Sequence, residues 1–485
     1  GNRIMEFTFG THVNRPELPL IKWKPDSKES MNAHMLLTGG SGSGKTTLLL
    51  KIARELALSN KHVFIFDLQG NMIVKDNLGN KIGNYIDFTA WDSKYGINPF
   101  EFETGVSNEE LEEIISSGTM SDAQKYKVRN SGPKVQVERI IEIIKKNFLP
   151  NMGTNQKDYL MYLFSDTYLC KDFKYNDVTS WLNELPSLAD TQKLIDRIKS
   201  HSLSDDGTVF DEESVNLITN IQGNIIGLNS LLSRLEEAND KEEVEKLISD
   251  LKKKAHDSLD SYIEIGIKNY TEKNISKNKE WFDARNINAE KYSSKEAMRT
   301  IEKMSSYINA LVDSGVFHST KPPVKNGLNV INISGLDVKI QRFMVDIWLG
   351  KVFKSCKIRG TYSERSNKMR GEKFDTIVVI DESKLIAGSS RDKNDPYSYL
   401  NRIATESRGV GLGLVVGAQS AEHFPQEFLK NFDSQIILNT GIADFDAVRK
   451  SFGLDKTLLE FTQGGWGNAL VKTGRNFSKV KLEVN

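Results

Sequence analysis

The sequence has few of the residues that build disulfide-rich or zinc-binding proteins. Two cysteines, Cys170 and Cys356, occur among 485 residues. They are too few for a disulfide framework, which is typical of a protein from a reducing compartment. The seven histidines are scattered, and none lies at metal-ligand spacing from another histidine or a cysteine. We therefore predict no zinc site.

Long hydrophobic runs and an excess of one charge are also missing. No apolar run approaches the roughly 18 residues of a membrane helix, and we expect no signal peptide. Lysine plus arginine equals aspartate plus glutamate at 65 each, so the net charge is zero. Overall charge therefore neither favours nor excludes a nucleic-acid partner, which only a local patch would attract. These features predict a soluble cytoplasmic protein with no membrane partner.

A phosphate-binding loop is the clearest motif in the chain. It follows the pattern G-x-x-x-x-G-K-[ST] and comprises Gly39, Gly40, Ser41, Gly42, Ser43, Gly44, Lys45, Thr46 and Thr47. The apolar run before it predicts a buried strand, and residues 46–58 carry a helical stripe. Glycines let successive backbone N–H groups point at phosphates, to which Lys45 adds a positive charge. The Thr46 hydroxyl is a ligand for Mg²⁺. We expect ATP and Mg²⁺ to bind here.

The rest of the chain predicts an α/β protein interrupted by helices. Strands are expected at 62–67, 328–334, 374–382, 412–417 and 434–439, with helices at 339–353 and 397–408. Prolines 16, 19 and 25 break any long element in residues 1–33, so we expect no separate domain there. A short polar tail is expected after Lys472. Residues 357–373 carry six cations against two glutamates and predict a loop.

Strand patterns almost vanish between residues 107 and 318, where helical patterns and mixed charges dominate. We interpret this region as an all-helical insertion whose charged runs are most simply solvated helix faces. The predicted division is a first part of the core at 1–105, the insertion at 106–322, and a second part of the core at 323–485.

A second motif completes the candidate active site. The four apolar residues 377–380 are followed by Asp381 and Glu382, the Walker B pattern. The strand would place the Asp381 carboxylate beside Mg²⁺, and Glu382 would activate the attacking water as a general base. The alternative is a buried strand that ends in two surface acids.

Gln419 and Arg408 are further candidates. Gln419 follows a predicted central strand, where ligands bind in open α/β sheets, so its amide is suited to sensing the γ-phosphate or the water. The alternative is an amide that caps the strand end. Arg408 ends a predicted helix, where it would act as an arginine finger or as a cation favoured by the helix dipole.

The sequence resembles the HerA/FtsK superfamily of ring-shaped P-loop translocases, which includes the conjugation ATPases. The resemblance rests on Gly39–Thr46, Asp67 with Gly70, Ile380–Glu382 and the run from Glu406 to Ser420; it covers about half the chain. It implies a RecA-like core with a mostly parallel sheet, a homo-oligomer that is a hexamer, ATP hydrolysis between subunits, and DNA in the pore. It also implies that Arg408 acts on the ATP of a neighbouring subunit.

Two features of the sequence depart from the usual pattern of HerA proteins. HerA proteins usually begin with a small β-barrel, for which residues 1–33 leave no space, and Ser383-Lys384 replace the usual Ala-His. A HerA-like core with a helical insertion resembles the motors of bacterial antiphage defence systems. We predict an ATP-dependent DNA translocase or helicase that works with a partner nuclease or another effector. The alternatives are a nucleotide-controlled platform that switches an effector without moving DNA, and a conjugation or secretion ATPase.

Overall fold

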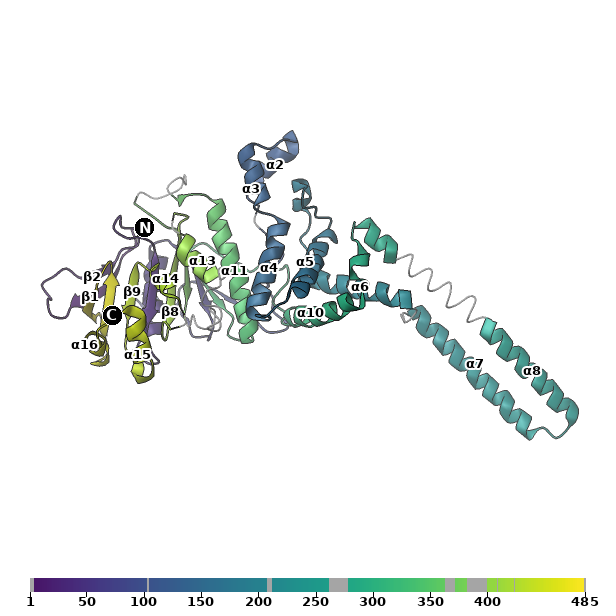
Figure 1. The fold of residues 1–485 in the computed structure, drawn as a ribbon. Helices are drawn as coiled ribbons and strands as arrows, with labels where there is room; N and C mark the ends of the chain where they lie inside the picture. The colour runs from purple at the N-terminus through teal and green to yellow at the C-terminus, as the bar shows by residue number, and fades with distance from the viewer. Residues whose placement is uncertain are drawn as a thin grey trace.

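One twisted sheet forms the body of the protein (Figure 1). The computed structural model describes residues 4–102, 104–206, 212–260, 278–362, 371–381, 399–407, 409–422 and 424–483. In these residues the sheet has 11 strands in the order β2-β1-β11-β10-β9-β3-β8-β7-β4-β6-β5. The strands from β9 to β5 are parallel, and the others are antiparallel. The predicted α/β class with a mostly parallel central sheet is confirmed.

The parallel strands carry the predicted apolar runs. They are β9 (Ser434–Ile437), β3 (His34–Thr38), β8 (Leu412–Ala418), β7 (Thr376–Ile380), β4 (His62–Asp67), β6 (Leu328–Asn332) and β5 (Asn84–Asp87). Every residue of β3, β7, β8 and β9 is buried. Such near-continuous apolar strands are expected where helices cover both faces of a sheet.

The antiparallel part of the sheet corrects one expectation. Its strands are β2 (Ile21–Trp23), β1 (Phe7–His12), β11 (Phe477–Leu482) and β10 (Asn468–Thr473). The prediction of a polar tail after Lys472 was wrong, because β11 pairs with both β10 and β1. The strands near the two ends of the chain therefore extend the sheet together. Pro16 and Pro19 lie between β1 and β2, and Pro25 follows β2.

Side chains that alternate along each strand pack on different helices. Met35 and Leu37 belong to one core with Leu49 and Ile52 of α1 (Lys45–Leu58). Leu36 belongs to the other core, which α11 (Val338–Ile358) and α13 (Tyr399–Glu406) cover. The predicted end of α11 at residue 353 was wrong, since the helix continues to Ile358. The C-terminal helices are α14 (Gln426–Leu429), α15 (Gly441–Phe452) and α16 (Lys456–Glu460).

Helices occupy the chain between β5 and β6. They are α2 (Asn108–Ser117), α3 (Asp122–Arg129), α4 (Pro133–Asn147), α5 (Thr154–Leu169), α6 (Leu188–Asp206), α7 (Glu212–Glu237), α8 (Lys241–Asp260) and α10 (Lys295–Asp313). Local signals set their ends: Ser107 caps α2, and Ser121 with Gln124 forms a capping box on α3. The large helical insertion that the sequence predicted is confirmed.

The insertion packs on the core through α4 and α11. Lys146 Nζ lies 3.1 Å from an Asp346 carboxylate oxygen, and both side chains are almost fully buried. The Asn147 amide donates to the same carboxylate at 3.0 Å. These bonds satisfy a charge pair that would be costly to bury alone, so they fix α4 against α11.

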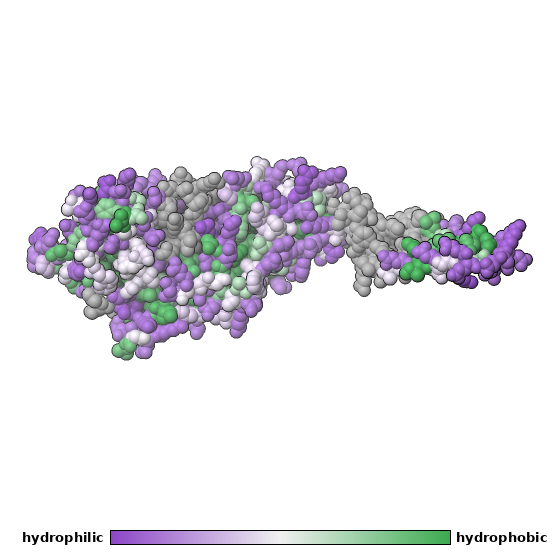
Figure 2. All heavy atoms as spheres, turned by 90° about the horizontal axis from the view of Figure 1, so that it is seen from below, coloured by the Kyte–Doolittle hydropathy of each residue, from purple (hydrophilic) through white to green (hydrophobic). Residues whose placement is uncertain are grey.

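Helices α7 and α8 pack on each other and extend away from the body (Figure 1). The arm is mostly hydrophilic but carries apolar patches (Figure 2). Its exposed apolar side chains include Ile225, Ile226, Leu232 and Ile248. Among the described residues, no helix is both long and apolar enough to cross a bilayer.

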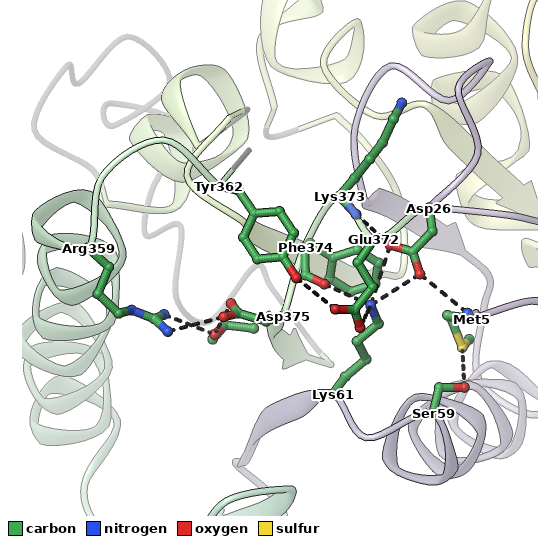
Figure 3. Close-up of polar contacts among 11 residues, drawn as sticks. Met5, Asp26, Ser59, Lys61, Arg359, Tyr362, Glu372, Lys373, Phe374 and Asp375 are labelled. Atoms are coloured by element: carbon green, nitrogen blue, oxygen red, sulfur yellow. Dashed lines mark hydrogen bonds and ion pairs between the residues drawn. The ribbon is translucent and has the colours of Figure 1, made fainter. Parts of the chain in front are cut away.

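A buried cluster of charged side chains lies at the amino ends of β4 and β7 (Figure 3). Lys61 Nζ, which is 0% exposed, lies 3.1 Å from Asp26 Oδ2 and 3.1 Å from Glu372 Oε1. It also donates to the Phe374 carbonyl at 2.7 Å. The Tyr362 hydroxyl donates to Glu372 at 2.9 Å, so Tyr362 and Glu372, which flank residues 363–370, are tied to the same lysine.

Replacement of Lys61 by methionine should destabilise the fold strongly, because it leaves two acidic side chains facing each other without their cation. Loss of one partner of a buried pair costs about 3–5 kcal/mol, to be measured as the free energy of unfolding in urea. Lys22→Met is the matched control, since Lys22 pairs with Glu6 on the surface and such pairs contribute about 0–1 kcal/mol. Equal losses in both variants would show that the cluster has no special role.

Candidate active site

The phosphate loop connects β3 to α1 and needs its glycines for two reasons. Gly42 and Gly44 have φ angles of 76° and 89°, a region that side chains disfavour. At Gly39 and Gly40, by contrast, there is no room for a side chain. A Cβ on Gly39 would lie 2.5 Å from Ser43 Oγ, and one on Gly40 would lie 3.0 Å from the Thr440 carbonyl oxygen. The loop is thus held closely against the start of α15.

Lys45, Thr46 and Asp381 meet at the carboxyl ends of the strands. Lys45 Nζ lies 3.2 Å from Asp381 Oδ1, and the lysine side chain is 6% exposed. The Thr46 hydroxyl donates to Asp381 Oδ2 at 2.9 Å. The two motifs that the sequence places 335 positions apart therefore share one carboxylate.

Strand order explains this meeting. Strand β8 lies between β3 and β7, so three neighbouring strands lead into the phosphate loop, Gln419 and Asp381. Gln419 is exposed directly after β8. Asp381 reaches across this middle strand because position 417 is glycine: a Cβ there would lie 2.5 Å from Asp381 Oδ1. Gly417 is a site residue that the sequence analysis missed, and the glycine-flanked run around β8 was the available signal.

The predicted site residues divide into two groups. Residues 39–47, Asp381 and Gln419 are described and lie around the same edge of the sheet. The predicted base Glu382 and the predicted finger Arg408 lie outside the described residues. Residues 363–370 of the predicted basic loop 357–373 also lie outside the described residues. Its first two residues, Lys357 and Ile358, belong to the last turn of α11.

Asp67, at the carboxyl end of β4, organises the next loop. Its Oδ1 accepts hydrogen bonds from the backbone N–H groups of Gln69, Gly70 and Asn71 at 2.8 to 3.3 Å. Its Oδ2 accepts one from Met72 at 3.1 Å. This carboxylate is 4% exposed and serves as a turn anchor.

The opposite edge of the sheet contains the neighbours of Arg408. Ser407 follows α13, and its hydroxyl lies 3.0 Å from Nε2 of His34 at the start of β3. Burial lowers the pKa of His34 to about 4, so this ring is neutral at pH 7. Gly409 accepts a hydrogen bond from the Tyr362 N–H at 2.6 Å. Ser407 and Gly409 thus precede β8, whereas Gln419 follows it.

A strand, a glycine-rich loop, a helix that begins with Lys-Thr and a strand that ends in aspartate define a P-loop ATPase. A family model of the CobQ/CobB/MinD/ParA nucleotide binding domain matches residues 34–314, more than half of the chain. The chain belongs to this family of nucleotide-binding domains. The matched region begins with β3 and contains the phosphate loop.

Curated relatives agree with the predicted resemblance. The DNA double-strand break repair helicase HerA of Sulfurisphaera tokodaii is 33% identical over 115 residues, which are 23% of this chain and 21% of that protein. HerA of Pyrococcus furiosus is 26% identical over 191 residues, 35% of this chain and 34% of that protein. The matches thus span about a fifth to a third of these relatives.

A solved structure is similar over the whole chain. VirB4 of Thermoanaerobacter pseudethanolicus superposes with a TM-score of 0.55 at 12% identity, over 100% of this chain and 98% of that one. At this identity the likeness concerns the fold. Together with the HerA matches it confirms the prediction of a HerA/FtsK-like P-loop ATPase.

Gly417→Ala should displace Asp381 and reduce ATPase turnover at least tenfold, because the added methyl group would overlap the Asp381 carboxylate. The matched control is Gly335→Ala, where a Cβ meets nothing within 4 Å. Steady-state ATPase assays on both variants, with thermal melts to verify folding, test this. Full activity in a folded Gly417→Ala variant would contradict the packing argument.

Proposed function

We propose that this chain is an ATP-dependent DNA translocase or helicase. It works as a homo-oligomeric ring, a hexamer, and hydrolyses ATP between subunits together with a nuclease or other effector, as in antiphage defence. The observation that carries the proposal is the junction of Lys45, Thr46 and Asp381. It unites the phosphate-binding and metal-supporting motifs that ATP hydrolysis needs. In this arrangement residues 39–47 hold the phosphates.

The donor set at the junction fits Mg²⁺. This ion is held in such sites by one or two carboxylates together with substrate phosphates, and the Thr46 hydroxyl with Asp381 supplies a matching pair of oxygens 2.9 Å apart. Among the described residues no group of three or more His, Cys, Asp or Glu side chains could hold a metal ion. When bound, Mg²⁺ would neutralise charge on the phosphates.

Hydrolysis also needs groups that act on water. Glu382 follows Asp381 directly and is proposed as the base that accepts the proton of the attacking water. Gln419 follows the strand between the two motifs, from which its amide would sense the γ-phosphate or orient that water. Glu382 would thus act on the water, and Gln419 on the γ-phosphate or on the same water.

The position of Ser407 and Gly409 supports a role for Arg408 in trans. Both residues precede β8, and the seven residues of this strand extend roughly 20 Å at about 3.3 Å each. This exceeds the length of an arginine side chain. An arginine finger in this place therefore acts on the nucleotide of a neighbouring subunit, whose carboxyl edge it would face.

DNA is proposed as the substrate of translocation for two reasons. The matched relatives are named as DNA double-strand break repair helicases, and residues 357–373 carry an excess of positive charge. Lys357 and Arg359 pair with Glu406 and Asp375, and Lys373 Nζ donates to the Ser30 carbonyl. We propose Arg365, Lys368 and Arg370 for the contacts with DNA phosphates. We further propose that 1–105 and 323–485 form the motor core and that 106–322 is an accessory insertion.

Glu382→Gln should retain ATP binding and lose hydrolysis, since the amide keeps the shape of the side chain but cannot accept a proton. Loss of a general base typically lowers the rate by about 10²–10⁴. Turnover at saturating ATP measures the rate, and equilibrium binding of ATP verifies that the site is intact. Wild-type turnover in this variant would exclude Glu382 as the base.

Mixed rings test whether Arg408 acts across subunits. The Arg408→Ala variant alone should bind ATP, and its rate of hydrolysis should be about 10³–10⁵-fold lower. Random mixtures with Glu382→Gln subunits create interfaces that join an intact Glu382 to an intact Arg408, and activity should rise above that of either variant.

A mixture that exchanges subunits yet stays inactive would contradict independent action in trans. Wild-type subunits titrated into each variant provide the control. Strict coordination around the ring predicts a steep loss of activity with each inactive subunit, whereas an arginine that acts within its own subunit predicts a linear one.

A further inference from the structure

An exposed tryptophan lies against the phosphate loop. Trp466 is 58% exposed, and its Nε1 is 3.4 Å from the position of a Cβ on Gly44. The indole thus lies within van der Waals distance of the position that a Cβ on Gly44 would take. The backbone at Trp466 is fixed on β11: Lys481 Nζ donates to the Trp466 carbonyl at 2.9 Å, and the Leu482 N–H donates to Gly467 at 2.8 Å.

A hollow of about 300 Å³ opens beside this indole. Its lining includes Thr8 and Phe9 of β1, Thr47, Lys51 and Glu55 of α1, and Trp466. This volume lies at the lower end of the roughly 300–1,000 Å³ usual for small-molecule sites. Burial, with a smaller effect of the nearby Arg54 cation, lowers the pKa of Lys51. The hollow thus combines an aromatic surface with charged groups of both signs.

The position of the hollow follows from the start of α1. Lys45 and Thr46 face Asp381, whereas Thr47 lines the hollow. Successive helix residues point about 100° apart, so the two environments lie on different sides of the first turn. When the terminal phosphates of a nucleoside triphosphate lie at Lys45 and Thr46, the rest of the molecule extends past Gly44 and Thr47 into the hollow.

We propose that the hollow receives the nucleoside of ATP and that the indole of Trp466 stacks on the purine base. The assignment rests on the proposed ATPase function and adds its base-binding residue. An exposed indole on a hydrogen-bonded backbone is suited to stacking, because its aromatic face is open to a base. The Glu55 carboxylate, which lies 3.7 Å from Arg54 Nε, adds an acceptor to the wall of the hollow.

The test compares ATP with inorganic tripolyphosphate, which carries the phosphates but no base. In the full chain, Trp466→Ala should weaken ATP binding about tenfold, within the range of base–aromatic stacking, and leave tripolyphosphate binding unchanged. Trp466→Phe should restore most of the ATP affinity. Trp91→Ala is the matched control, because Trp91 is 83% exposed and does not line the hollow.

The outcomes separate this assignment from the proposed function. Lys45→Ala should weaken binding of both ligands; a variant in which both affinities are unaltered would overturn the phosphate site itself. If Lys45→Ala loses binding but Trp466→Ala keeps wild-type ATP affinity, the phosphate site stands and the base-stacking role is wrong. Equal losses of ATP and tripolyphosphate affinity in folded Trp466→Ala would also overturn it, because the indole would then be supporting the loop.

Discussion

The carboxylate of Asp381 is the point on which the active site depends. It binds the Lys45 ammonium group at 3.2 Å and the Thr46 hydroxyl at 2.9 Å, and all three groups lie near the carboxyl ends of the fully buried strands β3 and β7. A lysine that is 6% exposed needs an anionic partner, since an unpaired charge at that depth is costly. The sheet order supplies it by placing one strand, β8, between β3 and β7. Gly417 on that strand leaves the space through which the carboxylate reaches.

The two edges of the parallel sheet carry different chemistry. The carboxyl edge holds the phosphate loop, Asp381 and Gln419. The amino edge holds Ser407, Gly409 and the buried Lys61 cluster (Figure 3). On the proposed function, the amino edge of one subunit faces the carboxyl edge of the next, so that Arg408 reaches a nucleotide it cannot reach in its own subunit. The Lys61 cluster then matters for function as well as stability, because it fixes the residues on either side of the basic segment 363–370.

Much of this arrangement follows from local sequence. The apolar runs before Gly39 and Asp381 predicted β3 and β7, and the glycine pattern predicted the loop between β3 and α1. The pairing of β1 with β11 was missed because each strand is short and its partner is more than 460 positions away along the chain. Periodicity carries no information on such distant pairs. Gly417 and Trp466 were missed for the same reason: their importance lies in contacts with Asp381 and Gly44, which only the assembled sheet creates. The charged patterns of α7 and α8 predicted helices but not an arm that leaves the body (Figure 1).

The central claim is that ATP hydrolysis is coupled to DNA. The most direct measurement is the steady-state ATPase rate of the full chain, at a protein concentration where its oligomeric state has been determined by light scattering, with and without duplex DNA. The account predicts that the assembled ring hydrolyses ATP faster when duplex DNA is present, and that this increase declines as salt screens the phosphate contacts. An identical rate with and without DNA, in protein shown to be assembled and to bind ATP, would contradict it.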